Sequence, residues 1–260
     1  MILDDIVEKR IVQLEREKAA VSLETVKKAA EKIDRKCISF KAALASPERL
    51  SVISEVKKAS PSKGLIQPDF DPVKIAKAYE ANGADAVSCL TEEHYFQGSS
   101  EYFKAIRKEI NLPMIRKDFI IDEYQIYEAR LMGADAILLI AAVLDDEKLK
   151  RFKAVTNSLG MDILAETHDE SELERVLAVD FDIIGINNRN LKTFEVTLDT
   201  TARLAGMIPN GKVIVSESGI RDNADMKIVR SYGADAVLIG ETLMRSGNIG
   251  ATLSALRENV

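Results

Sequence analysis

A five-residue motif, Gly-Ala-Asp-Ala followed by Val or Ile, occurs three times in this chain, beginning at Gly83, Gly133 and Gly233. Each copy follows a segment with helical periodicity and opens a short apolar run, so it is predicted to join a helix to a buried strand. A looser relative of the motif lies at 179–184, close to where a fourth copy is expected. Joins at this spacing imply about eight strand–helix units of roughly 25 residues each, which predicts an α/β fold, the (β/α)8 TIM barrel.

The eight strands of such a barrel can be placed on apolar segments of the chain, and helices on the intervals between them. The predicted strands cover 50–57, 85–90, 113–117, 135–140, 161–166, 182–187, 212–217 and 235–239. Helices with recognisable first residues are expected over 72–82, 122–132 and 145–159. Because no linker or shift in composition divides the 260 residues, we expect one domain over 1–260.

Two segments of the predicted barrel stand outside the repeating pattern. Residues 1–49 are expected to form an N-terminal helical extension with a buried stripe of Leu3, Val7, Ile11 and Leu14. This extension could either plug the bottom of the barrel or form a flap near its mouth. The loop at 60–68 is polar, rich in turn-forming residues and long for its position, which predicts a mobile lid.

Composition narrows the range of partners. The net charge of −6 argues against nucleic acid, and there is no apolar run near the roughly 18 residues that a bilayer requires. The acidic start of the chain is unlike a signal peptide, so we expect a cytoplasmic protein. The two cysteines form no disulfide framework, and Cys89 is expected in the core. The two histidines have no zinc-ligand spacing, so we expect no metal.

Polar side chains occur where the predicted strands end, and these ends form the catalytic face of a TIM barrel. Isolated charges at such positions are usually solvated rim residues, but six strands end this way. The acidic, basic and amide residues concerned are Glu55, Lys57, Lys117, Glu166, Asn187, Arg189, Glu217 and Glu241. Their convergence predicts acid–base chemistry over one cavity.

The loops after the last two strands are predicted to bind a phosphate. Ser218-Gly219 and Gly240-Glu241 carry the glycines that allow close approach of the backbone to a ligand. Barrel enzymes commonly hold phosphates here through backbone N–H groups, although simple tight turns would have the same composition.

Lys117 and Glu166 end neighbouring parts of the rim, and we expect them far enough apart to flank a small substrate. A lysine beside other cations in a partly dry pocket has a lowered pKa, so Lys117 could act as a general acid that is reprotonated near neutral pH. The same amine could instead form a Schiff base with a carbonyl substrate. Spacing alone does not separate these mechanisms.

At these residues the chain resembles the indole-3-glycerol phosphate synthase family over nearly its whole length. The most specific stretch is 53–64, Ile-Ser-Glu-Val-Lys-Lys-Ala-Ser-Pro-Ser-Lys-Gly. Further similar motifs occur in the family's order at 91–99, 116–119, 186–189 and 216–219. The resemblance implies an enzyme that closes the indole ring of 1-(2-carboxyphenylamino)-1-deoxyribulose 5-phosphate with loss of carbon dioxide and water, without a metal or organic cofactor.

The resemblance also implies a role for each matching residue. Lys117 would be the general acid, Glu166 the general base of the dehydration, and Lys57 a ligand of the carboxylate or phosphate that could also transfer a proton. Glu55 would orient and tune both lysines, and Asn187 and Glu217 would hold hydroxyls or the leaving group. The phosphate would be bound by Ser60, Ser218, Gly219, Gly240 and Glu241, and Arg189 would support Asn187.

The implied substrate is doubly anionic and has an aromatic end, and the chain offers groups for both. A cationic mouth is expected from Lys57, Lys58, Lys63, Arg116, Lys117 and Arg189. The wall for the aromatic ring is expected from Phe96, Phe119, Leu138 and Leu191. The chain has no tryptophan, so any contact that Trp makes in relatives is absent or replaced.

Three alternatives differ from this reading. Other phosphate-binding barrel isomerases use Cys or Asp on the first strand, by resemblance, where this chain has Glu55 and Lys57. A Schiff-base aldolase would use Lys117 as a nucleophile, and a binding protein would show no turnover. We expect a phosphorylated small molecule as the only class of ligand, and a monomer or weak homo-oligomer.

Overall fold

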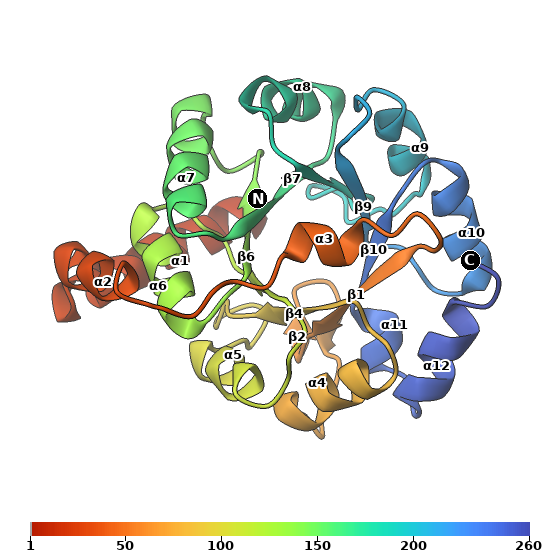
Figure 1. Ribbon diagram of the computed structural model, residues 1–260, viewed down its shortest axis with the longest axis horizontal. Helices are drawn as coiled ribbons and strands as arrows, with labels where there is room; N and C mark the ends of the chain where they lie inside the picture. Colours follow the sequence, from red (N-terminus) through yellow and green to blue (C-terminus); the bar gives the residue numbers. More distant parts are fainter. Residues whose placement is uncertain (1) are drawn as a thin grey trace.

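Eight parallel strands close into a barrel in the computed structural model, which describes residues 2–260 (Figure 1). Each strand pairs with its neighbours along the chain, and the last pairs with the first. The strands are β1 (Ser51–Val56), β4 (Ala86–Leu90), β5 (Met114–Lys117), β6 (Ala136–Ile140), β7 (Asp162–Thr167), β8 (Ile183–Asn187), β9 (Val213–Glu217) and β10 (Ala236–Ile239). The predicted fold class is confirmed, and every strand begins and ends within one residue of its predicted segment.

Helices follow the strands and surround the barrel (Figure 1). They are α4 (Pro72–Ala81), α5 (Ser100–Arg107), α6 (Glu123–Met132), α7 (Asp146–Ser158), α8 (Glu170–Val179), α9 (Asp199–Ala205), α10 (Asn223–Ser231), α11 (Glu241–Met244) and α12 (Ile249–Leu256). The three predicted helices are found, each with an aspartate N-cap whose side chain accepts a backbone N–H: Asp71, Asp122 and Asp145. These caps explain why the helices begin where the sequence indicates.

The repeated motif ties each helix end to the neighbouring strand. Its glycine has a positive φ, for example +86° at Gly133, which terminates the preceding helix in the left-handed region. The carboxylate of Asp135 then accepts the backbone N–H of Met114 at 2.9 Å, and the N–H of Asp135 donates to the carbonyl of the same residue. Asp85 and Asp235 make the same pair of contacts with the strands beside them. The motif therefore sets the register at the amino-terminal end of the barrel.

Replacing Asp135 with alanine is expected to lower the free energy of unfolding by about 3–5 kcal/mol, because two arginines lose their buried partner. The Asp135 side chain is fully buried and lies 2.9 Å from Nη1 of both Arg35 and Arg107. Urea denaturation measures the loss. Asp235→Ala is the matched control, with a loss on the order of 1–2 kcal/mol, since that carboxylate accepts the N–H of Ile214 at the same motif position. Equal losses in the two variants would contradict this account.

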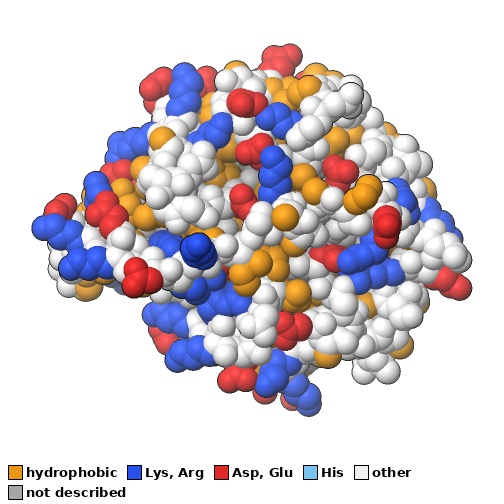
Figure 2. All heavy atoms as spheres, in the orientation of Figure 1, with side chains coloured by type: hydrophobic (Ala, Val, Ile, Leu, Met, Phe, Trp, Pro, Cys, Tyr) orange, Lys and Arg blue, Asp and Glu red, His pale blue; other side chains and the backbone are white. Residues whose placement is uncertain are grey.

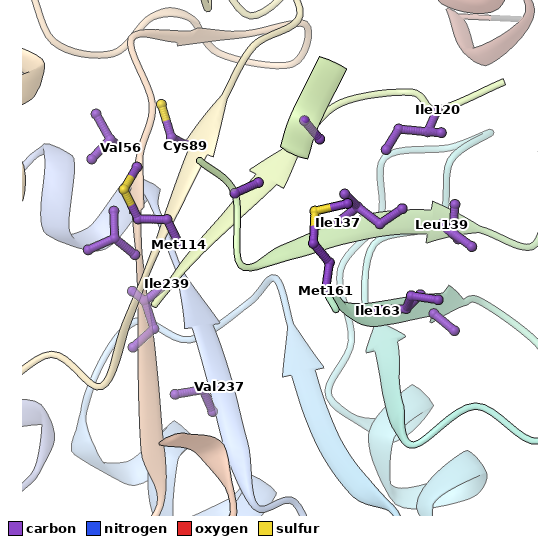
Figure 3. Close-up of a cluster of buried hydrophobic side chains, with 14 of the residues drawn as sticks. Val56, Cys89, Met114, Ile120, Ile137, Leu139, Met161, Ile163, Val237 and Ile239 are labelled. Atoms are coloured by element: carbon purple, nitrogen blue, oxygen red, sulfur yellow. The ribbon is translucent and has the colours of Figure 1, made fainter. Parts of the chain in front are cut away.

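Two apolar layers hold the structure together. Side chains that point outward from the strands pack under the helices, and Figure 3 shows Val56, Cys89 and Met114 of three adjacent strands in this outer layer. Cys89 is buried there, as predicted. The inward side chains, such as Ile115 and Leu164, fill the inside of the barrel. The alternation follows from the two-residue period of a strand.

The N-terminal extension covers both ends of the barrel. Helix α3 (Phe40–Leu44) closes the amino-terminal end, in front in Figure 1, where Phe40 and Leu44 join the inner core. Helix α1 (Ile2–Ala20) reaches the opposite end, where Leu3 and Ile6 line a cavity. The plug and the flap are thus different parts of one extension. The bridging helix α2 (Leu23–Ala30) packs on α6 and begins after the N-cap Ser22, whose side chain accepts the backbone N–H of Thr25.

The predicted stripe of α1 is buried at Leu14, half-buried at Leu3 and Val7, and wrong at Ile11. The helix buries Ile6, Arg10 and Leu14, whereas Ile11 is 45% exposed. The face of α1 that carries Arg10 points inward, because the Arg10 guanidinium lies 3.1 Å from Glu17 and 3.7 Å from Asp118. A polar anchor that hydrophobic periodicity does not detect thus decides the rotation of the helix.

The loop predicted as a lid contains a two-stranded hairpin of β2 (Ala59–Ser60) and β3 (Gly64–Leu65).

Basic and acidic side chains are interspersed over the face drawn in Figure 2, as expected for a helical outer ring. None of the helices between residues 2 and 260 has the length and apolar character that a membrane crossing requires.

Candidate active site

A cavity of about 780 Å³ opens at the carboxyl ends of the strands, a size typical of small-molecule sites. Seventeen of the nineteen residues that the sequence analysis assigned to the site line it, and the two exceptions are Lys58 and Arg116. The lining residues come from all eight strands of the barrel or the loops that follow them, the β2–β3 hairpin included, so the closed barrel brings together positions far apart in the chain.

The floor of the cavity is the last inward position of each strand. In β5 the inward residues are Ile115 and then Lys117, and in β7 they are Leu164 and then Glu166. The lower residues are apolar and fill the barrel, while the upper ones are polar. Strand alternation alone therefore aims these side chains into the cavity.

Lys117 lies between two carboxylates. Its Nζ is 3.0 Å from Oε2 of Glu166 and 2.5 Å from Oε2 of Glu217, and the lysine side chain is 12% exposed. The expectation that Lys117 and Glu166 stand apart is wrong, because their opposite charges pair across the cavity.

The electrostatics of this cluster differ from the sequence-based expectation. Burial opposes the charge of Lys117, but Glu166, Glu217 and Glu55 outweigh it and raise the pKa of the amine. The expected lowering is wrong because the nearest charges are anionic. Burial favours a neutral Glu166, yet Lys117 and His168 hold its pKa below the usual range. Burial raises the pKa of Glu217 to about 7, with Lys117 opposing and Glu166 supporting the shift.

A second ion pair lies beside the first. Nζ of Lys57 is 2.5 Å from Oε2 of Glu55, and both end β1. Gly240 packs against this pair: a Cβ at position 240 would lie 2.3 Å from Glu55 Oε2 and 2.9 Å from Lys57 Nζ. A glycine is required here by space, since its φ of −114° suits any residue.

Gly240→Ala is accordingly expected to displace the Glu55–Lys57 pair and lower kcat/KM by about 100-fold, a typical effect of misplacing a catalytic group by about 1 Å. Steady-state kinetics would measure it. The control is Gly247→Ala, where a new Cβ meets nothing within 4 Å and activity should stay unchanged. Full activity in Gly240→Ala would show that the pair needs no fixed position.

The two predicted phosphate loops lie together on the cavity rim. Ser218 and Gly219 follow β9 with φ of +65° and +90°, a tight turn that begins the loop. Gly240 is the N-cap of α11, and the Glu241 side chain turns to Arg245 at 2.9 Å. The acidic group at this helix start is therefore held by a cation.

The remaining predicted residues make contacts of two kinds. Asn187 donates from Nδ2 to Glu166 at 3.2 Å and accepts the backbone N–H of Arg189 at Oδ1, 3.0 Å away. The rings of Phe96 and Phe119 lie 6.2 Å apart, tilted by 39°. Leu138 and Leu191 also line the cavity, so the four residues predicted for the aromatic wall share one space with the acid–base cluster.

The predicted cationic mouth needs correction at two positions. Arg116 is 1% exposed and turns outward, with its guanidinium 2.9 Å from Asp118 and 2.7 Å from Glu128. Lys58 is half-buried outside the cavity lining. Two arginines that sequence reasoning missed, Arg221 and Arg245, line the cavity beside the phosphate loops.

Sequence reasoning also missed His168 and Gly185. His168 lies two residues after Glu166, and its Nε2 is 3.3 Å from Oε1 of that carboxylate. Gly185 leaves room for Glu217, because a Cβ there would lie 2.2 Å from Oε1 of Glu217. The two-residue spacing in β7 was a usable signal for His168, whereas nothing in the sequence marks Gly185 as the neighbour of Glu217.

A closed (β/α)8 barrel whose strand ends converge on buried lysines and glutamates defines a TIM-barrel enzyme with an acid–base site. The comparisons with known proteins name the family. A family model described as indole-3-glycerol phosphate synthase matches residues 3–256. The chain belongs to this family, and is thus a lyase of tryptophan biosynthesis that performs a decarboxylative ring closure.

Relatives that match over nearly their full length carry the name of the same family. Indole-3-glycerol phosphate synthase of Alkaliphilus metalliredigens is 50% identical over 100% of this chain and 99% of its own length. The Acetivibrio thermocellus protein of the same name is 52% identical over 96% of each chain. The Neisseria meningitidis one is 51% identical over 98% of each.

Solved structures with low sequence identity share the fold alone. 3-Hexulose-6-phosphate synthase from Salmonella typhimurium has a TM-score of 0.61 at 12% identity, covering 80% of this chain and 96% of that one. N-acetylmannosamine-6-phosphate 2-epimerase from Clostridium perfringens has a TM-score of 0.60 at 14% identity, covering 76% and 89%.

Proposed function

We propose that this cavity binds 1-(2-carboxyphenylamino)-1-deoxyribulose 5-phosphate and converts it to indole-3-glycerol phosphate by lysine and glutamate acid–base catalysis. The observation that carries the proposal is the position of Lys117, within 3.0 Å of both Glu166 and Glu217 on the cavity floor. The amine supplies a proton for the acid step, and the carboxylates can accept or hold protons in the later one.

Lys117 is the general acid in this proposal. Its raised pKa keeps the ammonium form at neutral pH, ready to protonate the substrate carbonyl oxygen while the aryl carbon attacks the carbonyl carbon. Carbon dioxide then leaves, and its bonding electrons restore the aromatic ring. The same protonated state argues against a Schiff base, because an ammonium group has no lone pair with which to attack.

The dehydration uses the carboxylates in contact with Lys117. Glu166 is ionised and accepts a proton from the closed-ring intermediate, and the leaving hydroxyl takes a proton from Lys57 or Lys117 and departs as water. Asn187 holds Glu166 at 3.2 Å. Glu217, with a pKa of about 7, can bind a hydroxyl either as donor or as acceptor.

Residues on the rim of the cavity are proposed to bind the substrate. Backbone N–H groups of Ser218, Gly219, Gly240 and Glu241, with the hydroxyl of Ser60, are proposed to hold the phosphate. The substrate carboxylate would lie near Lys57, which Glu55 orients. Phe96, Phe119, Leu138 and Leu191 would fold the aryl group against the ribulose chain, and such positioning can be worth several kcal/mol of barrier.

We further propose that the chain acts in the cytoplasm as a monomer or weak homo-oligomer, over one domain at 1–260. A biosynthetic enzyme of this kind takes its substrate from the preceding step of the pathway. The ring closure, the loss of carbon dioxide and the loss of water rearrange bonds of the substrate itself, and the side chains supply the proton transfers.

The test is direct because the chain has no tryptophan. Indole emission that grows after mixing enzyme and substrate must come from product, and we expect it with wild-type protein. Binding of substrate without emission would overturn the proposal in favour of a binding protein. Borohydride added during turnover is expected to trap no adduct on Lys117, whereas a covalent adduct would establish the Schiff-base mechanism.

A further inference from the structure

His168 is a buried titratable side chain with no role in the proposed reaction, and it lies between the carboxylates of Glu166 and Glu172. On one side its Nε2 is 3.3 Å from Oε1 of Glu166, an ion-pair distance. On the other its Nδ1 is 2.9 Å from Oε2 of Glu172, which also accepts the backbone N–H of His168 at 2.8 Å. The imidazole is 11% exposed, so few alternative partners are open to it.

Only the doubly protonated ring carries a positive charge that can pair with Glu166 while its Nδ1–H donates to Glu172. Burial opposes that charge, but Glu166 and Glu172 outweigh burial and raise the pKa of His168 to about 10. Glu172 lies in the first turn of α8, where Asp169 accepts its backbone N–H at 2.9 Å. The helix start thus supplies a fixed anion that holds the ring toward the cavity.

Glu166 needs a second cation beside it once Lys117 has given its proton to the substrate. When Lys117 gives its proton to the substrate, Glu166 loses the positive charge that lay 3.0 Å away. With neutral Lys117, the Glu217 side chain and the uncharged amide of Asn187 beside it, a buried Glu166 would favour its protonated form and could no longer act as base. His168 contacts Glu166 from the other side and keeps its charge through that step.

We propose that His168 is a positioning residue that holds Glu166 in place and ionised while Lys117 is neutral, with Glu172 holding His168 in turn. This inference rests on the proposed roles of Lys117 and Glu166. His168 touches no reacting atom in this account and acts through the carboxylate alone. The titratable groups in this chain of contacts are Glu166 of β7, Glu172 of α8, Lys117 of β5 and Glu217 of β9.

The first test is His168→Gln, which removes the charge but keeps a hydrogen-bonding side chain. We expect kcat to fall about 10–100-fold at pH 7, with KM changed less than about threefold. The acidic limb of the kcat–pH profile should move to higher pH by about one unit, because Glu166 then protonates more readily. His94→Gln, at the other and exposed histidine, is the control and should match wild type.

Glu172→Gln tests the positioning role of His168 even if the His168→Gln variant does not fold. It leaves the imidazole with one carboxylate, so His168 should lose its proton at lower pH. The kcat of this variant should then fall earlier on the alkaline side and stay near wild type at pH 6. A wild-type kcat and pH profile in both variants would overturn the role of His168. That result would leave the proposed function intact, since the proposed function fails only if wild type makes no indole product.

Discussion

Replacing Lys117 with alanine is expected to lower kcat by about 10³–10⁴-fold, as measured by the growth of indole emission under saturating substrate. The variant loses the only cation that lies 2.5–3.0 Å from both Glu166 and Glu217 within residues 2–260. Without it the carbonyl oxygen has no acid to take up its developing charge, while the phosphate loops and the apolar wall remain. KM should therefore change far less than kcat.

Two comparisons separate this effect from loss of structure. Lys104→Ala removes an exposed lysine paired with Glu101 on α5 and should leave kcat unchanged. Lys117→Met keeps most of the side-chain volume and should be as inactive as the alanine variant. A Lys117→Ala protein with full turnover would refute the assignment of the general acid.

Glu166→Gln is expected to block the reaction after decarboxylation, with kcat lowered by about 10²–10³-fold. Glutamine has nearly the same shape and can keep the contact with Asn187, but it cannot accept a proton at neutral pH. Because Lys117 remains, ring closure and loss of carbon dioxide can still occur once. Rapid mixing should show about one carbon dioxide released per site before any indole emission appears.

The order of these two signals is the decisive part of that experiment. If carbon dioxide and indole product appear together in Glu166→Gln at the wild-type rate, Glu166 is not the base. If neither appears, the carboxylate acts before decarboxylation, which contradicts the role proposed here. The neighbouring Glu170→Gln on α8 serves as control, because Glu170 is a half-buried residue outside the cavity lining that pairs with Arg203 at 2.6 Å.

The fold was predictable because its signals are local and repeated. The Gly-Ala-Asp-Ala motif carries a helix terminator and a strand-pairing carboxylate within a few residues, and the aspartate caps lie directly before their helices. The meeting of most of these polar strand ends in one cavity was predictable for a related reason. Strand ends of a barrel meet on one face, so residues such as Glu55 and Glu217 share a cavity wherever they lie in the chain.

The contacts within the site were not predictable to the same degree. Which carboxylate pairs with Lys117 depends on side-chain reach across the barrel, and the sequence carries no measure of that distance. The error at Arg116 was avoidable: adjacent strand residues face opposite sides, so an inward Lys117 requires an outward Arg116. The rotation of α1 was missed because the buried Arg10, not an apolar residue, anchors it.

The most direct measurement is a crystal structure of Lys117→Met with the substrate bound. The account predicts the phosphate on the backbone N–H groups of Ser218, Gly219, Gly240 and Glu241, and the ribulose carbonyl oxygen directed at the side chain of position 117. A phosphate bound elsewhere, or a carbonyl oxygen turned away from that side chain, would contradict it.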